Sequence, residues 1–349
     1  MAVNSGSLSA ALGGLVAVYK PADVSLTALK RILGRRIAVQ ANAAVGWPRL
    51  PSVEMPVVRE HKSGALVVVG KRKQLDYSQH PLVCGETYRH EDIRIQELLH
   101  METSSSGVCV FGINEGIESL DELRSQQWMN RWRLEGVLGR ETLKHEIKAK
   151  VTRREPYDHV SKQKLTKLFT RMRSDWRRIA FESAEVDLQS SEAYALATRG
   201  LPRPKLPGAQ VVVDLKLAFF RLPYFAVMSE TIGETDAYLR CLINEIGVNL
   251  GTTASPVRVI RRSLGPFFAE HCLLERQLSL QNIVDNVAMC RRTLKDFKYD
   301  PGVVNEPSKD TSSKGIQARK ELWERMAQHE LPPEEFDAMK PAWPRDYAA

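Results

Sequence analysis

Apolar positions along the first 70 residues follow strand spacing at first and then helix spacing. The run 15–19 predicts a strand, because it is apolar without interruption and a Lys-Pro turn follows it. Ser25 is a suitable N-cap for a helix. The apolar stripe of that helix is Leu26, Leu29, Ile32 and Leu33. Residues 40–62 show little pattern and predict a loop, whereas 66–69 predicts a short buried strand.

A longer alternation of strand and helix patterns follows. The run 108–113 is apolar throughout and predicts a central strand. From Trp132 to Leu138 apolar and polar residues alternate, which predicts a half-buried strand. The remaining elements predicted from spacing are helices at 118–128, 160–173 and 190–199, a hairpin of 211–220 with 224–229, and a helix at 235–246 that Gly247 ends.

This order of elements predicts an α+β protein. Strands and helices mix without the regular alternation of a doubly wound sheet, so we expect a mixed, mainly antiparallel sheet with flanking helices. Residues 14–297 are predicted to form one domain. The uncharged segment 1–13 is either a frayed terminus or a short presequence, and residues 298–349 have the composition of a mobile tail.

Composition narrows the partners only slightly. Fifty Lys and Arg against 42 Asp and Glu give a net charge of +8, which favours a polyanion without requiring one. The five cysteines have neither disulfide nor zinc spacing, so we expect a reducing compartment and no structural metal. No run reaches the roughly 18 apolar residues of a membrane-spanning helix.

Six segments in order resemble one family, the TruB-type RNA pseudouridine synthases. They cover about 14–290 and read GLVAVYKP from residue 14, ETSSSGVCVFG from 102, NRWRLEGVLG from 130, EAYALA from 192, AYLR from 237 and RRSLGPFF from 261. The segment HPLVCG from 80 is similar to the mitochondrial branch of animals in particular. The resemblance implies the TruB-like catalytic fold with a central RNA cleft and no PUA domain.

The resemblance also implies three chemical positions. Glu102 stands where the family has a catalytic Asp, Trp132 stands where it has a Tyr that stacks on the flipped uracil, and Arg240 matches the family's arginine. Glutamate places its carboxylate about 1.5 Å further from the backbone, and a shift near 1 Å can cost about 10²-fold in rate. Tryptophan keeps a stacking face but lacks a titratable hydroxyl. The catalytic centre therefore departs from the family at two positions.

Other interpretations of these positions stay open. Asp76 is a poor substitute for Glu102, because it precedes Gly85 by nine residues and no buried strand follows. Glu102 could be an idle loop carboxylate and Trp132 a core residue. Lys20 either contacts substrate or shapes its turn. The basic stretch from Arg131 to Arg178 is either a solvated face or a phosphate-binding surface.

Candidate RNA-binding residues are those that the resemblance and the basic stretch place beside the cleft. They are Lys20, Arg131, Arg133, Arg258, Arg261 and Arg262. The resemblance implies a mitochondrial enzyme that isomerises uridine in mRNA, tRNA or rRNA and needs neither metal nor cofactor. The alternative is an impaired pseudoenzyme that binds RNA or assists ribosome assembly, with proteins of RNA granules or ribosome assembly as further partners.

Overall fold

The computed structural model describes residues 12–45, 50–60, 64, 66–86, 88–205 and 208–304. These residues form two compact units. Unit 1 comprises the chain up to residue 103 with 108–125 and 269–295, and unit 2 comprises 104–107, 126–268 and the chain from 296. The strand β5 (Ser106–Ile113) begins in unit 2 and continues in unit 1. The single domain predicted for 14–297 stays a prediction. So do the predicted N-terminal segment 1–13 and the predicted tail 298–349, because residues 1–11 and 305–349 lie outside the described ranges.

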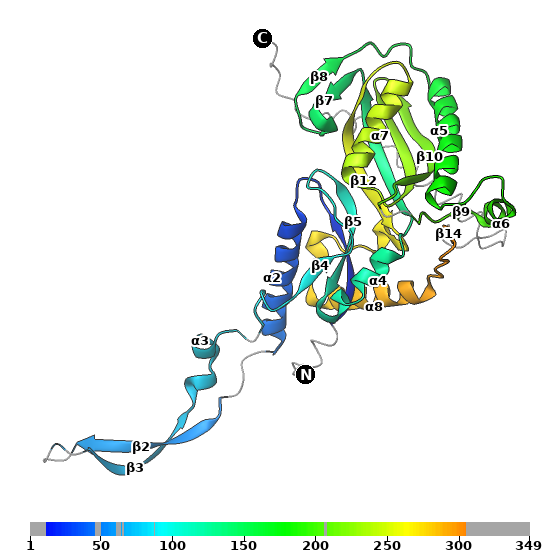
Figure 1. Cartoon of the computed structure of the whole chain (residues 1–349). Coiled ribbons are helices and arrows are strands. Elements are labelled where there is room, and N and C mark those ends of the chain that lie inside the picture. Colours follow the sequence, from blue (N-terminus) through cyan, green and yellow to red (C-terminus); the bar gives the residue numbers. More distant parts are fainter. Residues whose placement is uncertain are drawn as a thin grey trace, which may run out of the picture. The chain divides into compact units, whose positions relative to one another are not determined.

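Unit 1 combines strands with the helices α2 and α8 (Figure 1), and most of its buried residues are apolar. Its elements are β1 (Gly14–Lys20), α2 (Leu26–Val45), β2 (Ser52–Glu60), β3 (Leu66–Leu75), α3 (Pro81–Cys84), β4 (Ile95–Glu97), most of β5, α4 (Leu120–Ser125) and most of α8 (Leu280–Asp296). The expected strands at 15–19 and 108–113 are present and buried. Asn286 of α8 accepts a hydrogen bond from the Ala17 amide at 2.8 Å, which joins two distant segments of the unit.

Two predictions for the early chain are wrong. The supposed loop 40–62 contains the end of α2 and all of β2, and the supposed short buried strand at 66–69 is the start of the ten-residue β3. Alanines 41, 43 and 44 prolong the helix. The β2–β3 pair is an antiparallel hairpin, and the valines whose side chains the structure describes are exposed, Val68 to 59% and Val58 to 46%. The described side chains of the two strands are all exposed, so the hairpin does not show the alternation of apolar and polar residues that marks a half-buried strand.

Unit 2 is a twisted antiparallel sheet with two long helices beside it (Figure 1). Its elements are β6 (Asn130–Leu138), β7 (Arg140–Thr142), β8 (Val151–Arg154), α5 (Lys162–Ser183), α6 (Ser191–Arg199), β9 (Leu201–Pro202), β10 (Val211–Arg221), β11 (Tyr224–Ile232), α7 (Asp236–Asn249), β12 (Ala254–Leu264), β13 (Phe267–Phe268) and β14 (Val303–Val304). Strands β12, β6, β11 and β10 lie side by side in that order. The first residues of β5 pair with β12 in parallel. The mixed, mainly antiparallel sheet with flanking helices is confirmed.

Three further boundaries differ from expectation. The helix expected at 118–128 is only α4, and the one expected at 160–173 continues to Ser183 as α5. Gly247 lies inside α7 and does not end it. A side chain at this position would collide with the backbone of Thr253 and Ala254, so glycine is needed for close packing of the helix. The short strand β14 belongs to the segment 298–349 that was predicted as a tail, and it pairs with β9.

The strand β6 fixes the two faces of the sheet in unit 2. Trp132, Leu134 and Gly136 share one face because alternate residues point the same way. The absent side chain of Gly136 leaves room for the ring of Phe225 and for Ile243 of α7. Helix α7 therefore covers the face to which Trp132 belongs. The predicted half-burial of this strand is wrong, since its charged face is buried as well.

Candidate functional site

Glu102 lies in a loop of unit 1 that the Lys-Pro turn holds in place. The loop precedes β5, and Glu102 itself is half-buried. The neighbouring carbonyl oxygen of Thr103 accepts a hydrogen bond from Lys20 Nζ at 3.0 Å and another from the Asp23 amide at 2.8 Å. Lys20 is fully buried and also donates to the Pro21 carbonyl at 3.3 Å. These contacts favour the turn-shaping role over direct contact with RNA, and the RNA-binding assignment of Lys20 stays a prediction.

Trp132 lies in the core of unit 2 with its indole nitrogen engaged. Only 1% of the residue is exposed, and Nε1 donates a hydrogen bond to Glu234 Oε1 at 2.7 Å. The same oxygen accepts from Asn130 Nδ2 at 2.9 Å. Asn130 in turn accepts from the Gly265 amide at 3.1 Å. The tryptophan is thus held by a small polar network that also ties β6 to the chain after β12.

Arg261 covers one face of the Trp132 ring. Its guanidinium carbon lies 4.7 Å from the ring centroid, at cation–π distance, and the residue is 2% exposed. Glu234 is half-buried as a residue, but its Oε2 atom is buried and has no hydrogen-bond partner among the described residues. Burial raises the pKa of Glu234, and this outweighs the opposing effects of Arg261 and of the indole hydrogen bond. Trp132, Glu234 and Arg261 therefore form one buried cluster.

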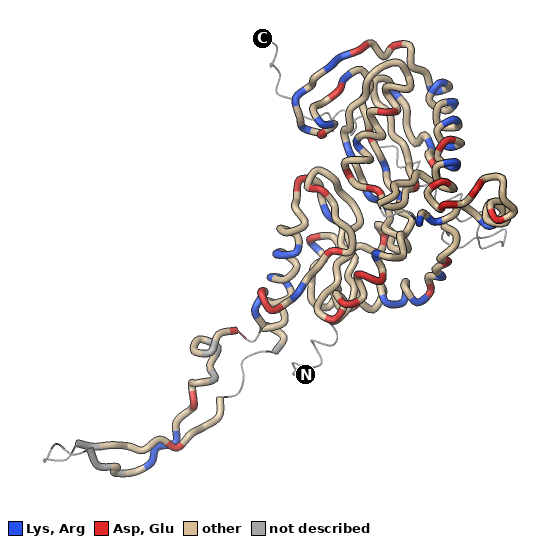
Figure 2. The backbone as a smooth tube through the Cα atoms, viewed as in Figure 1, with Lys and Arg blue, Asp and Glu red and all other residues tan. Residues whose placement is uncertain are grey.

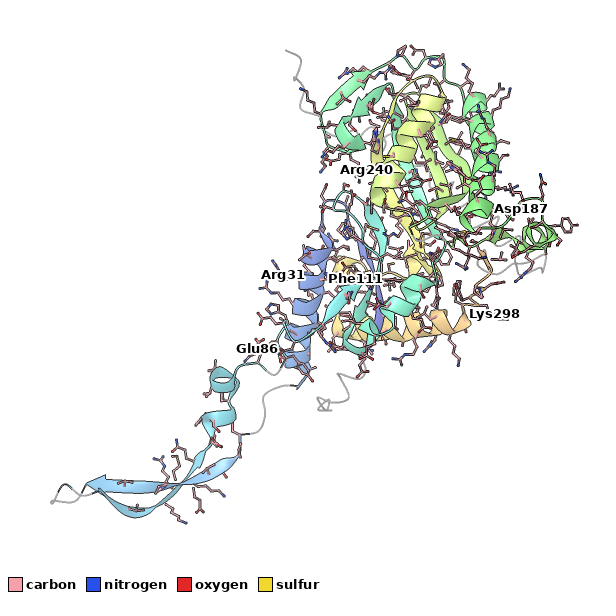
Figure 3. All side chains as sticks on the ribbon, in the orientation of Figure 1. Arg31, Glu86, Phe111, Asp187, Arg240 and Lys298 are labelled. Atoms are coloured by element: carbon pink, nitrogen blue, oxygen red, sulfur yellow. The ribbon has the colours of Figure 1, made fainter. Side chains whose placement is uncertain are left out.

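Arg240 belongs to the first turns of α7, which begins just after Glu234 (Figure 3). Thr235 caps this helix, because its side-chain oxygen accepts from the Tyr238 amide at 3.2 Å. Arg240 is only 7% exposed.

Tyr238, in the same helix, is also affected by its surroundings. Burial, with the charges of Glu245 and Glu234, raises the pKa of Tyr238 to about 12. Arg240 and Trp132 thus belong to unit 2, on one helix and one strand that pack together, and Glu102 belongs to unit 1.

Two of the predicted RNA-binding arginines lie on the opposite face of β6 and form ion pairs. Arg131 Nε is 2.9 Å from Glu230 Oε1, and Arg133 Nε is 2.7 Å from Glu135 Oε1. The four side chains are between 7% and 11% exposed. Burial raises the pKa of Glu230 even beside Arg131. These surroundings favour an internal role for both arginines.

The remaining predicted RNA-binding residues lie on β12. Arg261 is buried against Trp132, whereas Arg258 and Arg262 are half-buried. Their binding of RNA stays a prediction. Within the described ranges no group of three or more His, Cys, Asp or Glu could hold a metal ion. No described helix combines the length and the apolar character needed to cross a membrane.

Glu234 is the residue that the sequence did not single out. It stands in a turn, 102 positions after Trp132, and no motif marks it. One general signal was available. A buried indole N–H usually finds an acceptor, so placing Trp132 in the core implies that such an acceptor exists elsewhere in the chain. Its identity depends on the pairing of β6 with β11, which spacing alone does not give.

Comparison with known proteins gives a consistent set of relatives. No family model matches the chain. It is 28% identical over 312 residues to "Pseudouridylate synthase TRUB2, mitochondrial" of Xenopus tropicalis, covering 87% of this chain and 95% of the relative. The human protein of that name is 28% identical over 284 residues, covering 79% and 83%. Mouse "Pseudouridylate synthase TRUB1" is 25% identical over 198 residues, covering 56% and 57%.

Among solved structures, a chain of the "archaeal box H/ACA sRNP Nop10-Cbf5 complex" matches with a TM-score of 0.42 and 12% identity. A chain of "a Cbf5-Nop10-Gar1 Complex" matches with a TM-score of 0.41 and 12% identity. The matches cover 78% and 80% of this chain, which spans about half of each solved chain, 53% and 56%.

Proposed function

We propose that this chain, a member of the TruB-like pseudouridine synthase family, isomerises uridine to pseudouridine in mitochondrial RNA. The similarity to pseudouridylate synthases extends over most of the chain and nearly all of the Xenopus relative. Isomerisation of RNA is supported at the level of the family. The particular substrate, whether mRNA, tRNA or rRNA, is part of the proposal.

A mitochondrial location follows from the same relatives. The proteins of Xenopus tropicalis, human, rat and mouse that match over about four fifths or more of this chain are all named as mitochondrial. The uncharged start of the sequence suits a presequence only weakly, because it contains no arginine. The relatives therefore carry this assignment.

The proposed reaction exchanges one bond of the uracil for another. The bond between N1 and ribose C1′ breaks, the base turns, and a bond between C5 and C1′ forms. C5 then loses its proton and N1 gains one, so neither an oxidant nor a cofactor is needed for the balance. In this proposal the Glu102 carboxylate acts beside C1′ as nucleophile or as acid/base partner. The resemblance assigns Arg240 the positive charge that keeps the family's carboxylate ionised, and for this chain that role is part of the proposal.

The observation that carries the proposal is the fixed position of the loop at Glu102. Thr103 follows Glu102 in the chain, and its carbonyl oxygen accepts two hydrogen bonds, one from Lys20 Nζ and one from the Asp23 amide. Catalysis by a single carboxylate depends on such positioning, because an error near 1 Å can cost about 10²-fold in rate. A loop with an idle carboxylate would not need a buried lysine to hold it. The buried Lys20 therefore supports a chemical role for Glu102.

One observation favours a second function, that of an RNA-binding pseudoenzyme that assists mitochondrial RNA or ribosome assembly. Stacking on a flipped base needs an exposed ring face. Trp132 is 1% exposed, with Arg261 over one face and its N–H bonded to Glu234. Its partners would then include proteins of RNA granules or of ribosome assembly. In this second function the protein binds RNA but does not isomerise uridine.

One experiment separates the two functions. Purified wild type, Glu102→Asp and Glu102→Ala are incubated with total mitochondrial RNA, and pseudouridine is quantified by nucleoside mass spectrometry. RNA affinity is measured in parallel by filter binding. The proposal requires product with the wild type and none with Glu102→Ala at equal affinity. A wild type that binds RNA but forms no product contradicts the isomerase and supports the pseudoenzyme.

A further inference from the structure

Helix α5 presents very different residues on its two sides. Its buried side is apolar and packs beside β10. That side consists of Leu165, Phe169, Met172, Trp176 and Ala180. The spacing of three and four residues places them on one stripe of the helix. The apolar residues of α5 are thus nearly all used within unit 2.

The opposite side of α5 carries a line of cations, which we call the α5 basic face. It consists of Lys164, Lys167, Arg171 and Arg178, all of them exposed. Their spacing of three, four and seven residues keeps them on one stripe opposite the buried one. From first to last the stripe extends about 21 Å at 1.5 Å per residue. Lys and Arg recur along this helix in Figure 2.

Few carboxylates balance these cations. Helix α5 contains two acidic residues, Asp175 and Glu182. Their spacing from Arg171 and Arg178 puts both on the same exposed stripe, where four cations and two carboxylates leave a net charge of +2. Arg178 lies 3.6 Å from Glu182, with both side chains more than 60% exposed, and such a pair is weak. Neither Lys167 nor Arg171 forms an ion pair in the described part of the chain. Like charges gathered this way repel one another until a polyanion relieves them.

We propose that the α5 basic face binds the phosphate backbone of RNA. This inference rests on the proposed function, because it takes RNA as the partner. A membrane surface fits less well, since the apolar stripe that would enter it is buried against the sheet. A protein partner fits less well too, because Ile179, at 37%, is the main apolar exposure on this helix and interface centres need larger apolar anchors.

Phosphate contacts on α5 replace those predicted for the arginines of β6. Arg131 and Arg133 are ion-paired and buried, so a phosphate would have to replace Glu230 and Glu135 to reach them. Lys167 and Arg171 form no ion pair among the described residues, and the nearest carboxylate along their stripe, Asp175, is exposed and not bonded to Arg171. Backbone contacts of this kind carry affinity and orientation, and they do not read base sequence.

The test compares two triple variants with equal loss of charge. The first is Lys167→Gln, Arg171→Gln and Arg178→Gln on α5. The matched control is Arg31→Gln, Arg35→Gln and Arg36→Gln, three exposed arginines of α2 in unit 1. Binding of an unmodified tRNA transcript to the full chain is measured by fluorescence anisotropy between 50 mM and 200 mM salt. Thermal melting confirms that each variant is folded.

Each phosphate contact contributes about 0.7 to 0.9 to the slope of log affinity against log salt. The α5 variant should therefore lose about 2 to 3 units of slope and about 100-fold in affinity near 0.1 M salt. The α2 variant should keep the wild-type slope. Equal losses in both variants would show that net charge alone matters and would overturn the inference, as would unchanged binding by the α5 variant. If the wild type itself binds no RNA, the proposed function fails as well.

Discussion

Trp132 and Glu234 are 102 positions apart in the chain, and the indole nitrogen of one donates a 2.7 Å hydrogen bond to a carboxylate oxygen of the other. The resemblance to the TruB-type family sets Trp132 at the position of a tyrosine whose hydroxyl can relay a proton, and this assignment stays a prediction. An indole has a donor at its edge and no acceptor. Glu234 therefore provides the acceptor that a buried tryptophan needs at this position.

Loss of this acceptor should destabilise unit 2. Glu234→Ala leaves the N–H groups of Trp132 and Asn130 buried without a partner, at a cost of about 2 to 4 kcal/mol in the free energy of unfolding. Glu234→Gln keeps an accepting oxygen and should cost less than half as much. Urea unfolding monitored by tryptophan fluorescence measures both. Equal stability of wild type and Glu234→Ala would mean that the hydrogen bonds contribute nothing.

The same carboxyl should make stability depend on pH. Burial raises the pKa of Glu234 above its ordinary value of 4.5, so the folded chain holds this proton more tightly than the unfolded chain. The free energy of unfolding should therefore fall as pH rises from about 4.5 through the folded pKa.

Glu230 acts in the same direction, so the wild type is compared with Glu234→Gln. The difference in unfolding free energy, wild type minus variant, should decrease as pH increases over this window. A difference that stays constant or grows with pH would rule out the assigned direction for Glu234.

Much of the fold could be predicted where a buried face imposes a period. The strands β1 and β5, the hairpin β10–β11 and the helix α6 follow directly from apolar spacing. The hairpin β2–β3 could not be predicted, because those of its side chains that the structure describes are exposed and Pro56, a residue unusual within a strand, lies inside β2. A pattern of burial predicts only those strands that have a buried side.

The residues of the candidate site come from the family resemblance and stay a prediction, whereas their surroundings could not be derived from the sequence. Alternation along β6 made Arg133 and Glu135 look solvent-facing, and the structure pairs and buries them. The network around Trp132 joins β6, β12 and the turn before α7, so it exists only once the sheet has formed. The helix that carries Arg240 was predictable from its local apolar spacing, whereas the choice of Arg240 came from the family resemblance.

Lys20 should affect catalysis through the position of the Glu102 loop. Lys20→Met removes the hydrogen bonds to the Thr103 and Pro21 carbonyls. We expect about 10- to 100-fold slower isomerisation with unchanged RNA affinity, and a loss of about 1 to 3 kcal/mol in the free energy of unfolding.

Lys30→Met is the matched control for Lys20→Met. It removes a partly exposed ion pair with Glu97 in the same unit and should change the unfolding free energy by less than about 1 kcal/mol. Its isomerisation rate should equal that of the wild type. If both variants lose the same rate, the effect of Lys20 is not specific to the loop.

Gly107 should tolerate no side chain. Its φ of +120° is rare for other residues, and a Cβ would overlap the backbone carbonyl of Arg261, its partner in the β5–β12 pairing. Gly107→Ala should lower the free energy of unfolding by more than about 3 kcal/mol. Gly70→Ala in β3 is the control, since nothing lies within 4 Å of its Cβ position, and it should cost less than about 1 kcal/mol. Urea unfolding measures the loss of unfolding free energy in the two variants. Similar losses would contradict the close approach of β5 to β12.

The most direct test of the account is single-turnover tritium release from mitochondrial RNA labelled at uracil C5, because C5 loses its hydrogen only if the base has been isomerised. Glu102→Gln keeps the size of the side chain and removes its charge. We predict release by the wild type and at least about 10³-fold slower release by Glu102→Gln, with RNA affinities within about threefold of each other. Equal release by the two proteins, or none by a wild type that binds RNA, would contradict the assignment of Glu102 as the chemical group.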